Sequence, residues 1–485
     1  MQNYEEAQQE RHSETNDKLD LIISITKQGI PDARAQEMLK ERDEKIEELV
    51  GKLEKYEGPS QAQRDKALEA LREGRADEAE DFFHNEQKRL KPSILEYAEA
   101  TYQRGNAQFA ALKFHDALSS YKEAVRISPE NIEYLNSLGI LLKDYGDLDS
   151  AIQALSKAME LSEKASGNDT QEFSAILNNL GSAWHVKGDL DKAINFFTTS
   201  LAILEKSFDK DRHEVAVVLN NLGSAWQDKS NLDKAIGFYT RARAIDEMIF
   251  GKEHHYIANI LNNLGEAWRT KGDLDKAIDF YTRSLAINKK IFDKEHPSVA
   301  VSLNNLGSAW FAKGDLDKAI EFYTCSLAID ENVYGKEHPN VAIKLNNLGE
   351  AWRNKGDLDK AIDFFTRSLT IDEETFGKDH PNVAVTLNNL GSAWKAKDYL
   401  NKAIEFFTRS LEIDEKTFGK ESKNVAVRLN NLGSAWQAKG DLEKAFDFFT
   451  RAHAIMLATF GPDNPSTRTV AANLAIAIAA RDAAK

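Results

Sequence analysis

The sequence is poor in cysteine, in net basic charge and in long apolar runs. Among its 485 residues there is one cysteine, Cys325, so no disulfide can form within the chain, and a reducing compartment is compatible with this. The longest apolar cluster near the N-terminus, residues 19–25, is interrupted by Asp20 and Ser24 and is too short to span a bilayer. Residues 1–17 are polar and acidic, unlike a signal peptide. We therefore expect a soluble, cytoplasmic protein.

Acidic residues exceed basic ones by a wide margin. The chain has 78 Asp and Glu against 63 Lys and Arg, a formal net charge of −15 and a pI of about 5.4. General nucleic-acid binding requires a basic face, and docking on an anionic membrane requires basic charge as well. The composition therefore disfavours both nucleic acid and membrane as partners.

An eight-residue motif, Leu-Asn-Asn-Leu-Gly-x-Ala-Trp, recurs every 42 residues. A fixed period of this length is the sequence signature of a solenoid, in which stacked units replace a single large core. The seven copies begin at Leu177, Leu219, Leu261, Leu303, Leu345, Leu387 and Leu429, and their last residues are all seven tryptophans of the chain: Trp184, Trp226, Trp268, Trp310, Trp352, Trp394 and Trp436.

The motif predicts units of two helices. Helix A of one unit is expected over 299–313, a break follows at Gly314 and Asp315, and helix B is expected over 316–332 before a polar loop. We predict four segments: an N-terminal helical segment (1–58), three irregular units (61–166), seven near-identical units (167–461) and a capping helix (462–485). The predicted fold class is all-α.

The N-terminal segment carries a short apolar stripe over residues 32–56. Apolar residues follow 3/4 spacing there, with charged residues between them: Leu39, Ile46, Leu49, Leu53 and Tyr56. One interpretation is a small coiled coil that makes a homodimer or binds a partner. The other is a helix that folds back on the first repeat, because a coiled coil usually sustains three or four heptads.

The repeat resembles the tetratricopeptide repeat over about residues 61–482. The resemblance is carried by the spacing of Leu177, Leu180, Gly181, Trp184, Ala193 and Phe197. The 42-residue version, with the segment 338–342 before the motif at Leu345, is similar to the repeats of kinesin light chain and to those of bacterial tetratricopeptide proteins. The resemblance implies a right-handed α-solenoid whose concave groove binds peptides; it does not imply motor function.

Helix A has two distinct faces. Leu180 and Trp184 share the core face, whereas Asn179, Ser182 and Val186 group on another face. The resemblance implies that this second face lines the groove. The second Asn of the motif then forms a row of candidate peptide-binding residues: Asn179, Asn221, Asn263, Asn305, Asn347, Asn389 and Asn431.

An Asn side chain offers one acceptor and two donors, which matches the C=O and N–H of a peptide unit. Each hydrogen bond contributes only about 0.5–1.5 kcal/mol net, so several units must act together. The alternative is structural: the paired Asn residues tie one helix A to the next. Both roles can hold, one for each Asn.

Specificity is expected from groove positions that differ between units. The residue after each Trp varies most, and four of these residues are further candidates: Arg269, Phe311, Arg353 and Lys395. Glu266 and Glu350 replace the Ser of the motif three residues before an Arg. These Glu–Arg combinations are either surface pairs worth a few tenths of a kcal/mol or part of a charge pattern facing a ligand with acidic or mixed side chains.

No residue pattern indicates catalysis, a cofactor or a metal. Loop histidines at 254, 296, 338 and 380 stand one per unit, which does not give the clustered ligands that zinc requires. Cys325 occupies a helix B position where sister units have Arg. No phosphate-binding loop or catalytic triad stands out, so we expect a protein that is not an enzyme.

We predict a scaffold or adaptor that holds an extended peptide or a disordered segment of a partner protein through the Asn ladder. The first alternative is a peptide-sensing regulator whose superhelix changes shape on binding. The second is a self-assembling protein that dimerises through its N-terminal helices.

Overall fold

The computed structural model describes residues 32–54, 61–73, 75–90, 94–111, 113–207 and 212–483. These residues form α-helices and no strand, which confirms the all-α prediction. The predicted apolar patch at 19–25 lies outside the described residues. None of the described helices is long and apolar enough to cross a bilayer. The chain divides into two compact units, Met1–Asp293 and Lys294–Lys485, and each is described by itself.

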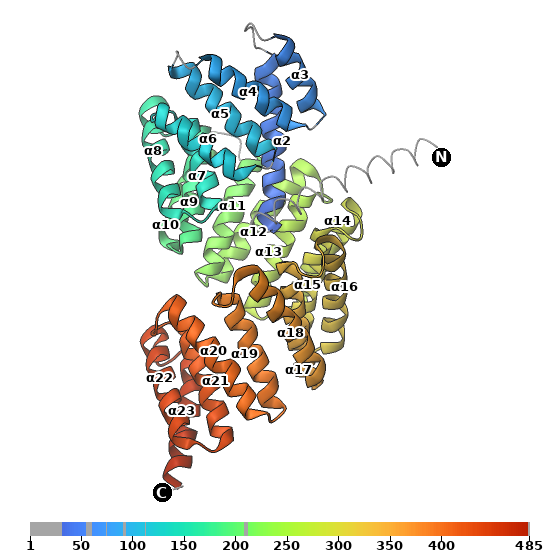
Figure 1. Cartoon of the computed structure of the whole chain (residues 1–485), viewed down its shortest axis with the longest axis vertical. Helices are drawn as coiled ribbons and strands as arrows, with labels where there is room; N and C mark the ends of the chain where they lie inside the picture. The colour runs from blue at the N-terminus through green and yellow to red at the C-terminus, as the bar shows by residue number, and fades with distance from the viewer. Residues whose placement is uncertain are drawn as a thin grey trace, which may run out of the picture. The chain divides into compact units, whose positions relative to one another are not determined.

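The first unit begins with a single helix, and antiparallel helix pairs follow it along the chain (Figure 1). The single helix is α2 (Asp32–Glu54). The pairs are α3 (Gln61–Arg72) with α4 (Ala76–Leu90), α5 (Ile94–Ala110) with α6 (Phe114–Ile127), α7 (Ile132–Asp144) with α8 (Leu148–Ser166), α9 (Gln171–Lys187) with α10 (Leu190–Ser207), α11 (His213–Asp228) with α12 (Leu232–Phe250), and α13 (His255–Lys271) with α14 (Leu274–Ile291).

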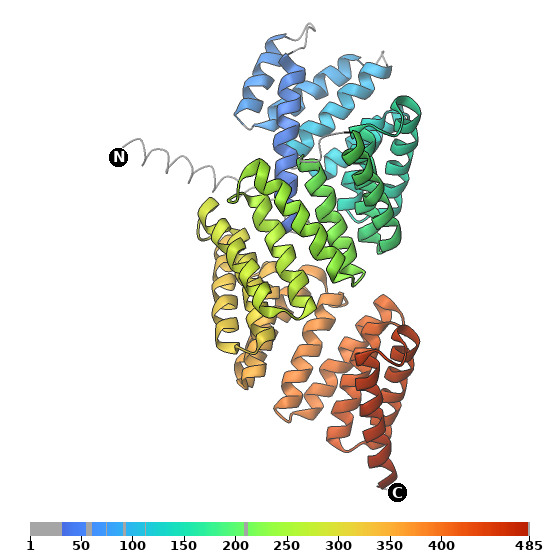
Figure 2. The same ribbon diagram turned by 180° about the vertical axis from the view of Figure 1, so that it is seen from behind.

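The second unit consists of the same kind of pairs and one final helix (Figure 2). The pairs are α15 (Pro297–Lys313) with α16 (Leu316–Tyr334), α17 (Pro339–Lys355) with α18 (Leu358–Phe376), α19 (Pro381–Ala396) with α20 (Leu400–Phe418), and α21 (Lys423–Lys439) with α22 (Leu442–Phe460); α23 (Pro465–Ala483) is the final helix. Within each unit every helix contacts its partner and the next pair, as in an α-solenoid. In each pair the first helix is helix A and the second is helix B.

A residue in the left-handed conformation joins helix A to helix B. Gly314 has φ 87° at the end of α15, as the predicted break requires. Two of the 42-residue repeats lack this glycine, and there Ser230 (φ 63°) and Asp398 (φ 67°) adopt the same conformation. The turn therefore survives replacement of its glycine, at a cost in backbone strain.

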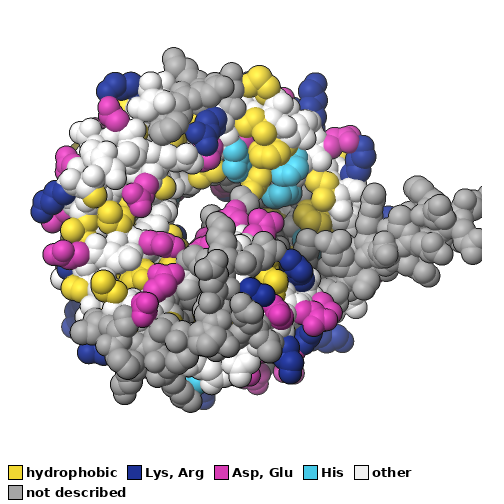
Figure 3. All heavy atoms as spheres, turned by 90° about the horizontal axis from the view of Figure 1, so that it is seen from above, with side chains coloured by type: hydrophobic (Ala, Val, Ile, Leu, Met, Phe, Trp, Pro, Cys, Tyr) yellow, Lys and Arg dark blue, Asp and Glu magenta, His cyan; other side chains and the backbone are white. Residues whose placement is uncertain are grey.

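The loop histidines cap the following helix A. The Nδ1 of His338 accepts the N–H of Asn340 at 3.2 Å, and its ring stacks on Tyr334 with ring centroids 4.5 Å apart. His380 does the same for Asn382 and Phe376. In the first unit three histidines join this kind of cluster, His213, His254 and His255 beside Phe250 and Tyr256, and Figure 3 shows histidines gathered beside hydrophobic side chains on one face. The histidine row therefore has a structural role in helix starts and loop packing.

Helices A and B approach closely at the glycine of the motif. A Cβ added to Gly349 would lie 2.5 Å from the ring of Phe365, which is fully buried. The tryptophan lies at the margin of the core: Trp352 is partly buried, and Nζ of Lys360 sits 3.8 Å from its ring centroid. Lys355 lies near the same ring and pairs with Asp317 of the preceding helix B. Lys355 thus links neighbouring pairs, as Lys397 does with Asp359, besides suiting the helix dipole.

Consecutive A helices within a unit contact each other, for example α15 with α17 and α17 with α19. Consecutive B helices in the described part of the chain make no contacts of similar extent. Because the stack is tighter along its A helices, each unit curves with helix A on the inner side. This is the side that the sequence analysis assigned to the groove.

In the second unit, a buried polar pair joins each of α16, α18 and α20 to the next helix, and its chemistry changes from pair to pair. Nζ of Lys344 lies 3.6 Å from Asp330, the hydroxyl of Thr386 donates to Asp372 at 2.9 Å, and Nε of Arg428 donates to Asp414 at 2.9 Å. These side chains are nearly inaccessible to solvent. At the next junction two apolar residues, Met456 and Val470, take their place. The residue on each helix B is therefore matched in chemistry to the residue that it contacts on the next helix.

Replacing Asp372 by asparagine is expected to stabilise the second unit by about 2 kcal/mol at pH 7. Burial raises the pKa of Asp372 from 3.8 to about 6, so the folded protein disfavours the carboxylate. This penalty is present above pH 6 and disappears as the pH falls toward 4. Urea unfolding of the wild type and Asp372→Asn at pH 7 and pH 4.5 would test this, and an equal gain at both pH values would contradict it.

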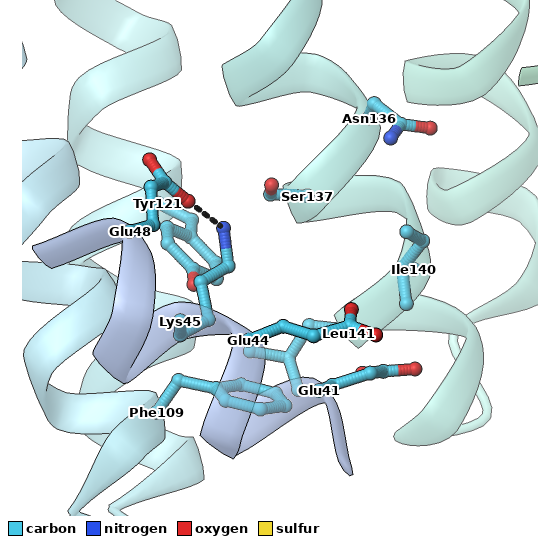
Figure 4. A pocket seen from close by; sticks show the side chains of 10 residues that line it. All are labelled: Glu41, Glu44, Lys45, Glu48, Phe109, Tyr121, Asn136, Ser137, Ile140 and Leu141. Atoms are coloured by element: carbon cyan, nitrogen blue, oxygen red, sulfur yellow. Dashed lines mark hydrogen bonds and ion pairs between the residues drawn. The ribbon is translucent and has the colours of Figure 1, made fainter. Parts of the chain in front are cut away.

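Helix α2 packs against α3 and α5, on the inner side of the first pairs. Leu49 and Leu53 are buried there, and Nε of Arg42 donates to the carbonyl of Ala110 at 2.8 Å. Figure 4 shows a pocket in which Glu41, Glu44 and Lys45 of α2 face residues of α7; these include Asn136, Ser137 and Ile140. Of the two sequence interpretations, the structure supports the helix that folds back on the repeats.

Candidate peptide-binding groove

The groove face is the row of helix A positions that point away from the core. In α17 these are Ile343, Asn347, Glu350 and Asn354, spaced 4, 3 and 4 residues apart along one stripe. All four are at least partly exposed. The same stripe recurs on each helix A of the second unit, and on α9, α11 and α13 of the first unit. Because consecutive A helices are in contact, these stripes form a continuous surface within each unit.

The Asn residues of the motif bond to one another across neighbouring helices. The second Asn of one helix A donates from Nδ2 to Oδ1 of the first Asn in the preceding helix A, 43 residues earlier, as Asn347 does to Asn304 at 2.8 Å. In the first unit the donors are Asn179, Asn221 and Asn263; in the second unit they are Asn347, Asn389, Asn431 and Asn473. The structural tie considered in the sequence analysis is therefore present in both rows.

The tie does not use the whole hydrogen-bonding capacity of the Asn ladder. Apart from Asn388 and Asn389, each donor Asn keeps its Oδ1 and one N–H, and each acceptor Asn keeps its amide protons. Within the described residues, Oδ1 of Asn347 and Asn431 accepts no bond, whereas that of Asn389 accepts a long one of 3.5 Å from Asn388. The ladder residues are also partly exposed, except for the buried Asn388. Donors and acceptors are thus left over on the groove face after the helices have been tied together.

Most charged side chains that follow the tryptophan are engaged within the chain. Arg269 donates twice to Glu266, at 2.6 and 2.8 Å, and Arg353 donates to Glu350 at 2.7 Å. These are the pairs three residues apart that the sequence analysis considered. The hydrogen bonds from Arg269 hold the pKa of Glu266 below its usual range despite burial. His185 pairs in the same way with Asp228 of the next helix A, at 2.7 Å.

Phe311 and Lys395 differ from these paired positions. Phe311 is half-buried and packs against the core cluster around Tyr323, so only part of its ring is open to a ligand. Nζ of Lys395 donates to Oγ of Ser434 on the next helix A at 2.5 Å. No carboxylate in the described part of the chain pairs with Lys395. Burial accordingly lowers the pKa of the Lys395 ammonium.

The sequence analysis missed a row of exposed aliphatic residues on the groove face. These residues stand two positions before the first Leu of the motif: Val301 (38% exposed), Ile343 (52%), Val385 (42%) and Val427 (40%) in the second unit, and Val217 (36%) in the first. Each stands four residues before the second Asn and so shares its stripe. The signal was present in the sequence, because an apolar residue recurs at this position although the core face of helix A is already supplied by leucines.

The family model described as tetratricopeptide repeat matches residues 131–206, 172–248, 216–290, 256–332, 298–353, 340–416, 393–458 and 424–482. No curated protein matches the chain. A solved structure of Podosopora anserina putative kinesin light chain nearly identical TPR-like repeats is 24% identical, with a TM-score of 0.39 over 43% of this chain and 98% of that one.

Two other solved structures are similar over more of the chain. The signal transduction ATPase with a tetratricopeptide repeat sensor from Pyrococcus horikoshii is 16% identical, with a TM-score of 0.53 over 75% of this chain and 53% of that one. The apo form of the quorum sensor NprR from B. thuringiensis is 14% identical, with a TM-score of 0.52 over 75% of this chain and 100% of that one. At these identities the likeness shows the fold alone.

The family matches extend from residue 131 to residue 482, more than half of the chain. This fold is typically a non-enzymatic scaffold for protein interactions. The chain therefore belongs to the tetratricopeptide repeat family.

Proposed function

We propose that the chain binds an extended segment of a partner protein on the groove face of its A helices. The observation that carries this proposal is the juxtaposition of two rows, one of exposed aliphatic side chains and one of Asn amides with unused donors and acceptors. Amides pair with a peptide backbone, and aliphatic side chains pack against its apolar side chains. Such a face favours an extended peptide over a small polar ligand.

Two features of the second unit support this assignment. Ile343, Val385 and Val427 lie on three successive A helices and are exposed well beyond what the packing of the pairs requires. The Asn ladder runs beside them, so an extended chain laid across the A helices would meet an aliphatic side chain and an amide at each step. Every contact is weak, and affinity requires that several units act together.

The alternatives from the sequence analysis compare unequally with this proposal. Leu49 and Leu53 of α2, which a homodimer would use, are buried within the chain where α2 packs against α3 and α5, and this favours a scaffold over a self-assembling protein. The sensor alternative requires a change of shape when the ligand binds. Small-angle scattering of the whole chain with and without a bound peptide addresses it, because a scaffold is expected to keep its scattering profile and a sensor is not.

The experiment that tests the proposal uses a random library of displayed peptides and the whole chain. We expect the library to yield binding peptides, and the triple variant Ile343→Ser, Val385→Ser, Val427→Ser to bind them at least about tenfold more weakly, because each serine removes apolar contact with the ligand. These side chains take no part in the Asn ladder, so the stack should keep its melting temperature.

Leu457→Ser is the matched control, because Leu457 is an aliphatic residue of similar exposure (41%) on helix B. It should leave peptide binding unchanged. The proposal is wrong if the library yields no binding peptide. It is also wrong if the triple variant binds the peptides as well as the wild type does.

A further inference from the structure

Lys395 is the one charged residue after a motif tryptophan in the second unit that lacks a charged partner among the described residues. In α17 the equivalent residue, Arg353, pairs with Glu350 three residues before it. In α19 the residue three positions before Lys395 is Ser392, so α19 has no carboxylate equivalent to that of Glu350. Lys395 therefore lacks the acidic neighbour that Arg353 has in the preceding repeat.

The position of the Lys395 ammonium is fixed by the next helix A. Its Nζ donates to Oγ of Ser434, which lies on the groove face of α21. An ammonium has three donors, and this bond uses one of them. The side chain is half-buried, and burial of the unpaired charge lowers its pKa. A charge held in this way gains more from an incoming carboxylate than a solvated surface lysine does.

The side chains around Lys395 indicate which kind of ligand would supply such a carboxylate. On the groove face of the second unit, the charges of Glu350 and Arg353 cancel, while the other residues of the stripes on α19 and α21 are aliphatic, hydroxyl or amide: Val385, Asn389, Ser392, Ala396, Val427, Asn431, Ser434 and Ala438. A single positive charge therefore stands in an uncharged strip of a chain whose net charge is −15. This arrangement is complementary to one acidic residue and unsuited to an acidic tract.

The aliphatic row continues on both sides of Lys395, at Ile343 on α17 and at Val427 on α21. A peptide that ended at Lys395 would leave one side of this row uncovered. The geometry thus favours the side chain of an internal Asp or Glu over a C-terminal carboxylate.

We infer that Lys395 anchors a single Asp or Glu side chain, flanked by apolar residues, of an extended peptide lying on the groove face of α17, α19 and α21. This inference rests on the proposed function and names the chemistry of its ligand. The carboxylate accepts from Nζ of Lys395 and from the hydroxyl of Ser434, while the flanking residues pack on Ile343 and Val427.

The test is selection from the same random peptide library with the whole chain and its variants. Peptides selected on the wild type should share an Asp or Glu at one fixed position between apolar residues. Lys395→Gln should lose this preference, and Lys395→Glu should select Lys or Arg at that position. Glutamine is safe for the fold, because Gln227 and Gln437 occupy the equivalent place in sister units. Lys378→Gln, which removes an exposed loop lysine, is the matched control and should select the same peptides as the wild type.

A synthetic peptide from the selection, amidated at its C-terminus, gives the quantitative comparison. Changing its acidic residue to the amide should weaken binding to the wild type about tenfold and leave binding to Lys395→Gln unchanged. An equal loss in both proteins, or selected peptides without a fixed acidic position, would overturn the inference while peptide binding itself stands. Preference for a free C-terminal carboxylate would also overturn it. If no peptide binds at all, the proposed function fails and the inference fails with it.

Discussion

Replacing Arg428 by valine is expected to lower the free energy of unfolding of the second unit by about 3–5 kcal/mol. Arg428 is 7% exposed, and its Nε donates to the carboxylate of Asp414, which is 1% exposed. Burial already raises the pKa of Asp414 although Arg428 opposes this. Removing the guanidinium would leave the carboxylate buried without a countercharge, and breaking a buried pair costs far more than the pair contributes.

The chain offers its own control for this experiment. At the next junction the equivalent residues are Met456 and Val470, an apolar pair in the same packing environment. The double variant Asp414→Met, Arg428→Val copies that pair and should restore the stability of the wild type or exceed it. Urea unfolding and amide hydrogen exchange in α20 and α21 measure both variants. If the single and double variants were equally destabilised, the unpaired carboxylate would not be the cause.

The apolar periodicity within one repeat made much of the fold predictable from the sequence. Helix A was predicted over 299–313 and is observed over Pro297–Lys313, and helix B was predicted over 316–332 and is observed over Leu316–Tyr334. Both elements are long and strongly periodic, and a left-handed residue marks the turn between them. The same pattern places Asn347 on the exposed face of helix A, as predicted. These features depend on local spacing alone.

Contacts between successive repeats were much harder to predict. The donor and acceptor of the Asn ladder are 43 residues apart, and nothing in one unit shows that Asn347 reaches Asn304 until the stacking of the A helices is known. The buried junction pairs carried a signal that was not used. Asp330 and Lys344, and likewise Asp414 and Arg428, are 14 residues apart in sequence, and their chemistry changes together. The short heptad stripe of α2 likewise did not show whether it packs on the repeats or on another chain, because that choice depends on tertiary contacts.

Valine at Gly349 is expected to destabilise the second unit by about 3 kcal/mol or more. A Cβ at this position would lie 2.5 Å from Cε1 and 2.6 Å from Cδ1 of Phe365, a separation that forces the helices or the ring to move. Phe365 is fully buried and cannot turn out of the way. Because Gly349 is on the same helix as Ile343 and Asn347, a shift of α17 away from α18 would also displace the groove face, and selected peptides should bind more weakly.

Valine at two other glycines should have smaller effects, because an added Cβ there would lie farther from its neighbours. Gly433 would place its Cβ 3.0 Å from the ring of Phe449, so Gly433→Val should cost less than Gly349→Val. Gly237 in α12 has nothing within 4 Å of an added Cβ, and Gly237→Val should be close to neutral. Phe365→Ala opens the space that the valine needs, so its combination with Gly349→Val should cost less than the sum of the two single changes. If the losses in chemical denaturation were additive and did not follow these distances, helix propensity rather than the contact between helices A and B would explain the conserved spacing of glycine and aromatic residue within this chain.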